Sequence, residues 1–211
     1  MQNKLLLSLT ASCLVLSACT STMEVNDSKG RATVYEDTSR VGKVAGVGIE
    51  SQDILSMTDK MIRDMLTNPL LVKQSKPPRV IIDSEYFYNE SSSRLNKNMI
   101  TDRLRVNLNR AANGRMVFVG RHYSNMVEKE RQLKRSGVTD AGTIRKTKAS
   151  AGGDYRLGGR ITSQDAYSPK TGAVSRFTQI TFEMIDLEYG TIIWSGIYDY
   201  KKSAQDDILY R

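Results

Sequence analysis

The chain has 211 residues, of which 39% are hydrophobic, and it carries 31 Lys and Arg against 23 Asp and Glu. This length is enough for one domain with a core of its own. Two cysteines and one histidine give little material for a zinc site or a disulfide framework. The net charge of +8 indicates an anionic partner or a solvated basic surface.

The N-terminus has the features of a lipoprotein export signal. Residues 1–18 carry one charge, Lys4, followed by an apolar stretch from Leu5 to Leu16. Because this stretch is too short for a permanent membrane-spanning helix, it indicates an export signal. The segment LSAC, which ends at Cys19, has the pattern of a bacterial lipobox. We therefore predict a signal peptide over 1–18 and lipidation at Cys19; an ordinary secretory signal with an incidental cysteine is the alternative.

The predicted mature chain keeps the acylated cysteine alone, so no disulfide is available to it. Thr20 follows this cysteine, and bacterial lipoproteins without Asp at that position usually pass to the outer membrane. We predict lipid anchoring in the outer membrane, facing the periplasm. Residues 19–40 are polar and too poor in large apolar groups to fold alone, which predicts a flexible tether. A single globular domain is expected over 41–211.

The first element of this domain is a predicted helix that starts near Ser51, its expected N-cap, and ends at Asn68 before Pro69. Its apolar stripe is rich in methionine. Soft-metal binding is one function of such a stripe, but neither cysteine nor histidine accompanies it, so core packing is favoured. The stripe consists of Ile54, Met57, Met61 and Met65.

Residues 79–120 predict a strand, a helix and a strand. RVIIDSEYFY is rich in strand formers, 96–112 has helical periodicity with Gly114 at its end, and RMVFVG is a short strand. This order predicts a right-handed βαβ unit with parallel strands. Two more helices, over 122–135 and more weakly within 140–153, are expected to cover a sheet face.

The C-terminal third alternates with the period of strands. Three strands are predicted, joined by glycine-containing turns at 168–172 and 188–190, which gives an antiparallel meander. In the last strand, one core-facing side is expected to hold Ile192, Trp194, Tyr198 and Tyr200. The predicted fold class is α/β, in the mixed α+β sense: a single mixed sheet with an N-terminal βαβ part, a C-terminal three-stranded antiparallel meander, and helices packed on the sheet.

The motifs of catalysis are mostly missing. His122 is the one histidine, and the G-x-S-x-G motif of serine hydrolases and the phosphate-binding loop are absent. GVGIES at 46–51 matches a dinucleotide fingerprint only in part, and Asp186 with Glu188 suits a turn better than acid–base catalysis. We predict that the chain is not an enzyme and needs no cofactor or metal.

Positive charge is concentrated in the middle of the chain. Residues 94–156 hold 15 basic and 5 acidic residues, a net charge of +10. Nucleic acid is excluded as a partner by the predicted export. Anionic lipid headgroups, an anionic glycan or an acidic protein surface remain, as does a basic face that is simply solvated.

Several segments together resemble one known family. These are the lipobox, GIESQDILSMTDKM, KERQLKRSG, GGDYRLGGRITS, FEMIDLEYGTIIWSGIYDYKK and the terminal DDILYR. They look like the LpoB family of outer-membrane lipoproteins, which activate bifunctional penicillin-binding proteins, and the resemblance covers 42–211. It implies a small domain similar to the N-terminal domain of TolB that acts in peptidoglycan synthesis and cell shape by docking on a synthase, without an active site of its own.

The resemblance supplies no interface residues, so the candidates come from the residues themselves. The polar sides of the helices over 96–112 and 122–135 present the cations Arg103, Arg110, Arg131 and Lys134. Their alternative interpretation is a solvated basic surface. For the whole chain, the alternative to a synthase activator is a structural or secretion-apparatus lipoprotein in an oligomeric assembly, because the short tether suits a nearby partner. A periplasmic hydrolase using His122 is the third hypothesis.

Overall fold

The computed structural model describes residues 34–40, 46–145 and 149–205. The predicted signal peptide and the lipidation site Cys19 lie outside these residues. Within the described ranges, no helix is both long and apolar enough to cross a membrane.

The chain divides into two compact units, Met1–Glu36 and Asp37–Arg211. The described part of the first unit, residues 34–36, has no regular secondary structure. All the helices and strands below belong to the second unit.

Six strands form one mixed sheet in the order β3-β1-β4-β5-β6, and β2 also pairs with β4. β1 pairs with β3 in parallel, and both β1 and β2 pair with β4 in parallel, whereas β4–β5 and β5–β6 are antiparallel. This topology confirms the predicted mixed sheet with a C-terminal meander. The strands are β1 Arg79–Ile81, β2 Phe87–Glu90, β3 Val117–Phe118, β4 Tyr155–Tyr167, β5 Ala173–Asp186 and β6 Ile192–Gln205.

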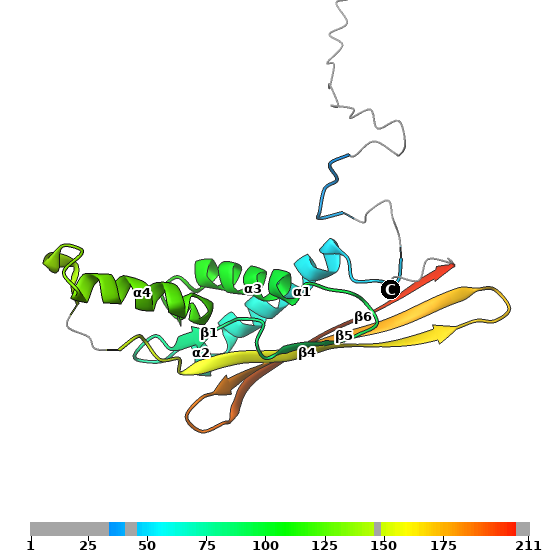
Figure 1. Ribbon diagram of the computed structural model, residues 1–211. Coiled ribbons are helices and arrows are strands. Elements are labelled where there is room, and N and C mark those ends of the chain that lie inside the picture. Colours follow the sequence, from blue (N-terminus) through cyan, green and yellow to red (C-terminus); the bar gives the residue numbers. More distant parts are fainter. Residues whose placement is uncertain (1–33, 41–45, 146–148, 206–211) are drawn as a thin grey trace, which may run out of the picture. The chain divides into compact units, whose positions relative to one another are not determined.

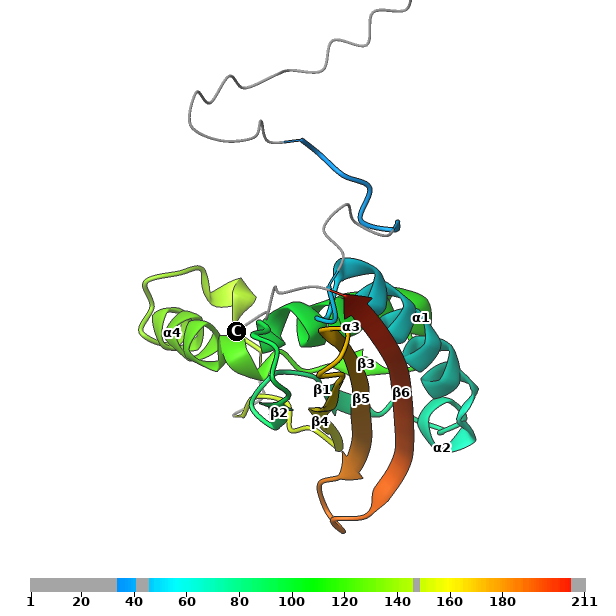
Figure 2. The same cartoon turned by 90° about the vertical axis from the view of Figure 1, so that its right-hand side faces the viewer.

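The helices are α1 Ser51–Thr67, α2 Pro69–Val72, α3 Lys97–Ala112 and α4 Ser124–Arg135, with two short 3₁₀ helices, η1 Arg121–Tyr123 and η2 Ala141–Thr143. Helices α1 and α3 lie on one face of the sheet, as Figures 1 and 2 show from two directions. The opposite face carries no helix among the described residues (Figure 1).

The predicted N-cap of α1 is wrong by one residue. Glu50 is the N-cap, and its side chain accepts a hydrogen bond from the backbone of Asp53. In return, the Asp53 carboxylate accepts the Glu50 N–H at 2.8 Å. This reciprocal capping box satisfies two orphan donors of the first turn, which a serine hydroxyl at position 51 would not do alone.

The core lies between the methionine stripe of α1 and the sheet. Met57, Met61 and Met65 are fully buried, as are Ile180, Phe182 and Met184 of β5. The stripe is therefore core, as predicted. Trp194 is also buried, and its indole N–H donates to Asp64 of α1 at 2.8 Å, so an otherwise costly buried donor is satisfied.

One prediction for the last strand is wrong. Ile192 is 54% exposed, although Trp194 two residues later is buried. The pairing of β5 with β6 is irregular at Met184 and Ile185, where Met184 pairs with Trp194 but Ile185 pairs with Ile192. The extra residue, Ile193, breaks the alternation and packs against the core in place of Ile192.

An ion pair with a buried guanidinium ties β4 and β5 to the segment after β2. The Arg176 guanidinium, 2% exposed, donates to both carboxylate oxygens of Asp165 at 2.6 and 2.8 Å and to Ser93 Oγ at 3.1 Å. The hydrogen bond from Arg176 holds the pKa of Asp165 below its usual range. The paired form therefore stabilises the fold above the ordinary carboxyl pKa, and this contribution is lost as pH falls through the lowered value.

Two consecutive glycines of β4 have different structural roles. The rings of Phe87 and Phe182 stack with centroids 4.8 Å apart beside Gly159. A Cβ at Gly159 would collide with the Thr181 carbonyl oxygen and lie 2.8 Å from the Phe182 ring. A Cβ at Gly158 would meet its nearest neighbours at 3.5 Å, an ordinary contact. The fold therefore requires glycine at 159 but not at 158.

We expect Gly159→Ala to lower the free energy of unfolding by about 3 kcal/mol, because β5 or the phenylalanine stack must move. Gly158→Ala, the matched control, should change it by less than about 0.5 kcal/mol. Urea unfolding followed by circular dichroism measures both values. Equal effects of the two substitutions would contradict the close approach at Gly159.

Candidate functional site

Helix α4 stands apart from the core. None of its residues is buried, and Met126 is 62% exposed. Its main neighbours are η1 and η2, and Figure 1 shows it extending beyond the part of the sheet that α1 and α3 cover. The prediction that 122–135 covers a sheet face is wrong, because no residue of α4 is buried and its main contacts are with η1 and η2.

The second predicted helix, within 140–153, is also wrong for its described part. Only Ala141–Thr143 is helical, as the 3₁₀ turn η2, and residues 149–153 have no helix or strand. Asp140 caps η2 by accepting the Gly142 N–H at 2.9 Å. The turn brings residues 143–145 back beside α4.

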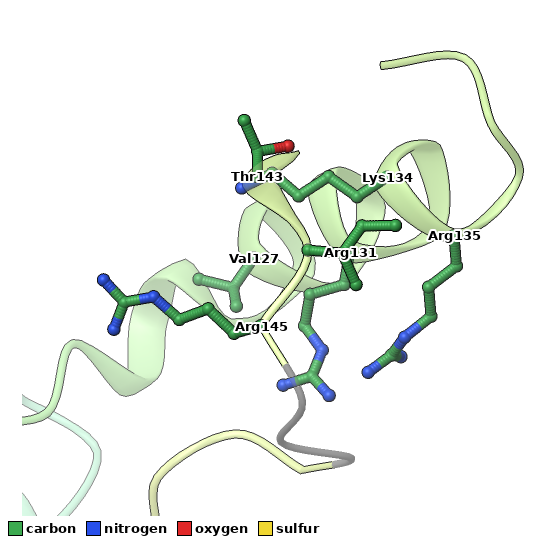
Figure 3. Close-up of a pocket in the computed structure, with 7 residues that line it drawn as sticks. Val127, Arg131, Lys134, Arg135, Thr143 and Arg145 are labelled. Atoms are coloured by element: carbon green, nitrogen blue, oxygen red, sulfur yellow. The ribbon is translucent and has the colours of Figure 1, made fainter. Parts of the chain in front are cut away.

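A basic hollow of about 200 Å³ lies between α4 and residues 143–145 (Figure 3). Figure 3 shows Arg131 and Arg135 pointing to the same side, while Lys134 extends toward Thr143. Four of the lining side chains are cationic and none is acidic. The basic hollow is lined by Val127, Arg131, Lys134, Arg135, Thr143, Ile144 and Arg145.

Two of the cations of the basic hollow make weak polar contacts within the domain. Arg131 Nη1 donates to Ser150 Oγ at 3.4 Å, and Lys134 Nζ lies 3.8 Å from a Glu130 carboxylate oxygen. A half-exposed ion pair between residues four apart on a helix contributes only about 0.3–0.5 kcal/mol. Gathered cations repel one another, so an anion that enters the hollow relieves this repulsion. The arrangement suits reversible contact with an anionic group.

The structure brings together two of the four predicted partner residues. Arg131 and Lys134 line the basic hollow, whereas Arg103 and Arg110 lie on α3. Arg110 is exposed and Arg103 is half-buried. Sequence reasoning missed Arg135 and Arg145; helical spacing from Arg131 signals the first, but the second depends on the turn at η2.

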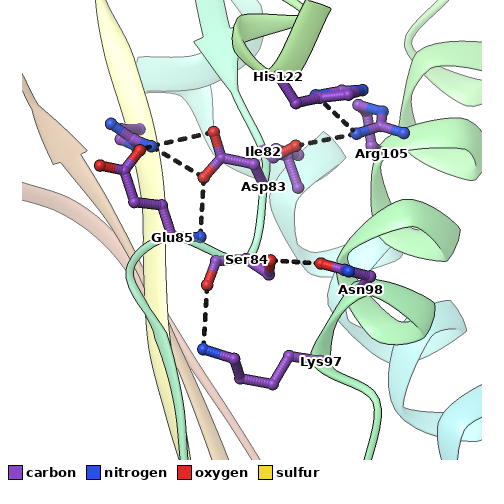
Figure 4. Close-up of polar contacts among 9 residues, drawn as sticks. Ile82, Asp83, Ser84, Glu85, Lys97, Asn98, Arg105 and His122 are labelled. Carbon is purple, nitrogen blue, oxygen red and sulfur yellow. Dashed lines mark hydrogen bonds and ion pairs between the residues drawn. The ribbon is translucent and has the colours of Figure 1, made fainter.

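His122 belongs to a polar network around the link between β1 and β2 (Figure 4). Its Nδ1 lies 3.4 Å from Arg105 Nη1, and the same nitrogen of Arg105 donates to the Ile82 carbonyl oxygen at 3.4 Å. Arg105 also pairs with Asp102 at 2.8 Å. No cluster of three or more His, Cys, Asp or Glu side chains suited to a metal occurs among the residues that the structure describes.

The same network fixes the link to β4. Arg156 donates to both carboxylate oxygens of Asp83, at 2.9 and 3.0 Å, and to Glu85 (Figure 4). Burial alone would lower the pKa of Arg156, but its hydrogen bonds to Asp83 and Glu85 and their negative charges raise it. In the same link, the Ser84 hydroxyl donates a hydrogen bond to the side-chain oxygen of Asn98 in α3. These contacts split the single predicted strand over 79–88 into β1 and β2.

Asp186 and Glu188, the paired acids noted in the sequence, form a turn. The Asp186 carboxylate accepts the backbone N–H groups of Glu188 and Tyr189 at 2.8 and 3.0 Å. This geometry is the turn chemistry that the sequence favoured.

A comparison with protein families identifies the chain. The sequence model of the family described as peptidoglycan-synthase activator LpoB matches residues 53–200. The chain belongs to the LpoB family. Among curated proteins, no significant match is found.

Three solved structures are also similar to this chain. The LpoB C-terminal domain from Escherichia coli is 17% identical, with 70% of this chain and 98% of that one covered and a TM-score of 0.41. The corresponding domain from Salmonella enterica is 18% identical over 70% and 94%, with a TM-score of 0.36. Lipoprotein GNA1162 from Neisseria meningitidis is 17% identical over 63% and 88%, with a TM-score of 0.31. The family assignment itself depends on the match to the family's sequence model.

If α4 lies outside the core, Met126→Ala should change the free energy of unfolding by less than about 0.5 kcal/mol. Met61→Ala, the same substitution at a buried site of α1, should cost about 3 kcal/mol because it leaves a cavity. Chemical denaturation of both variants compares them directly. A cost at Met126 similar to that at Met61 would mean that α4 packs on the core.

Proposed function

We propose that this LpoB-family chain is an outer-membrane-anchored lipoprotein that faces the periplasm and activates a bifunctional penicillin-binding protein by contact. The match of the family's sequence model to residues 53–200 carries this proposal, because the family consists of peptidoglycan-synthase activators. The lipobox at Cys19 supports the location.

The contact surface in this proposal is the basic hollow with the exposed side of α4. No residue of α4 is buried in its own domain, so the apolar side chains of this helix are available to an external partner. The lining combines four cations with the apolar side chains of Val127 and Ile144. Such a surface complements an acidic patch with an apolar centre, where charge steers the encounter and apolar burial adds affinity.

Activation by contact requires no chemistry from this chain. The partner holds the active site, and binding shifts it toward a more active conformation by differential affinity for its states. Arg103 and Arg110 on α3 remain candidates for a second contact. The ion pairs of Arg105, Arg156 and Arg176 are structural in this account, because each binds carboxylates of its own domain.

The double variant Arg131→Gln/Lys134→Gln should reduce stimulation of glycan polymerisation by a cognate synthase by about tenfold, which corresponds to about 1.4 kcal/mol of contact energy. The control Lys73→Gln/Lys201→Gln removes two exposed cations elsewhere and should leave stimulation unchanged. Polymerisation of labelled lipid-linked precursor, with the full chain in detergent, measures the effect. Equal losses in both variants would refute a specific role of the basic hollow.

Cys19→Ala should abolish fatty-acid labelling and release the protein from membranes, because the thiol of this cysteine is the proposed attachment point of the lipid. Metabolic labelling with a palmitate analogue and membrane fractionation check this result. Labelling that persists in the variant would refute the predicted anchor.

A further inference from the structure

The sheet face opposite α1 and α3 carries a groove beside the link between β1 and β2. Tyr86 is 47% and Tyr88 51% exposed, so both rings meet solvent although each is large and aromatic. One hollow, of about 330 Å³, includes Tyr86, Tyr88, Gly158, Arg160, Thr181 and Glu183 in its lining. A second, of about 300 Å³, is lined by Tyr86, Arg156, Gly158, Ile185 and Leu187.

The two hollows adjoin, because both are lined by Tyr86 and Gly158, and together they are called here the tyrosine groove. Each part has the volume of a small-molecule site. Gly158 is common to both parts, and its φ is not in the left-handed region. Since a Cβ would fit there at 3.5 Å from Ile185 and the Tyr86 carbonyl oxygen, the fold does not require glycine. The absence of a side chain at Gly158 leaves the groove unfilled.

The groove is held in place before any ligand arrives. The Arg156 guanidinium lies over the Tyr86 ring, with its central carbon 4.4 Å from the ring centroid. Arg156 is itself fixed by Asp83 and Glu85. Tyr88 has the ammonium of Lys97 at 5.8 Å from its centroid. The Tyr86 ring, held in this way, loses little conformational entropy when a ligand stacks on it.

The tyrosine groove contains both hydrogen-bond donors and hydrogen-bond acceptors. In the pairing of the strands, Tyr88 lies opposite Arg160, which lies opposite Thr181, and Gly158 lies opposite Glu183. The groove thus presents a guanidinium donor, a carboxylate acceptor and hydroxyl groups that do both. This set differs from the basic hollow at α4, where all four charges are positive. It suits a neutral ligand with many hydroxyl or amide groups.

We infer that the tyrosine groove binds a neutral saccharide chain, in which the C–H face of a sugar ring stacks on Tyr88 or Tyr86 and its hydroxyl and acetamide groups bond to Arg160, Thr181 and Glu183. The negative face of an aromatic ring attracts the slightly positive C–H groups of a sugar. Since the family activates peptidoglycan synthases, the saccharide of choice is the N-acetyl-amino-sugar backbone of peptidoglycan. This choice of sugar rests on the proposed function, whereas the groove and its chemistry do not.

The inference is tested by calorimetric titration of the full chain in detergent with two probes. These are the tetramer and the hexamer of N-acetylglucosamine, which carry no charge and share the N-acetyl-amino-sugar chemistry of the peptidoglycan backbone. Both should bind, and Tyr88→Ala and Gly158→Val should each weaken binding at least about tenfold, because one removes a stacking ring and the other fills the groove. Tyr167→Ala, at an exposed tyrosine at the end of β4, should leave binding unchanged.

The outcomes separate this inference from the proposed function. Arg131→Gln/Lys134→Gln should keep glycan binding, and the Tyr88→Ala protein should keep contact with the synthase. Absence of glycan binding at millimolar concentration, binding of free stem peptides instead, or loss of the synthase complex on Tyr88→Ala would each overturn the inference. If Gly158→Val lowers the unfolding midpoint, Tyr88→Ala decides alone, since its ring is half exposed.

Discussion

One edge of β4 pairs with two short strands in succession, β1 and then β2. The arrangement of the other elements depends on the link between these two strands. β1 pairs at Tyr155 and Arg156, and β2 pairs from Gly159 onward, so the chain between them leaves the sheet over 82–86. Arg156 holds this link by binding Asp83 and Glu85. On one side the link reaches α3 through Ser84 and Asn98, and on the other it places Tyr86 against the open face.

This arrangement leaves the domain with two surfaces of different chemistry. The basic hollow at α4 is rich in cations and lies on a helix that the core does not hold. The tyrosine groove lies on the sheet and has both charges and aromatic rings. A rigid sheet can hold a ligand in one orientation. A helix outside the core can adapt to a partner at small cost in stability. In the proposed function, the two surfaces can serve different contacts at once.

The elements that the sequence predicted well are those whose pattern is local. Alternation over Ile180, Phe182 and Met184 identified the core face of β5, and the methionine stripe identified α1. The break at 82–86 was missed because its cause, Arg156, lies more than seventy residues away. The exposed Ile192 was missed because a bulge depends on both strands.

The candidate sites were predictable to a smaller degree. Arg131 and Lys134 are three residues apart on one helix, so their proximity follows from helical geometry. Arg145 joins them only because η2 turns the chain back. Gly158 and Gly159 are adjacent and identical in the sequence, yet one leaves a groove open and the other permits a backbone contact. Only the neighbours of each Cβ position distinguish these roles.

In the proposed function, this LpoB-family chain touches a penicillin-binding protein through α4. A photo-crosslinking residue at position 135, beside the basic hollow, tests it most directly in living cells that express the full chain. We expect a crosslink to a bifunctional penicillin-binding protein from position 135 and none from position 73, which is exposed after α2. A crosslink to the synthase from position 73 but not from 135 would contradict it.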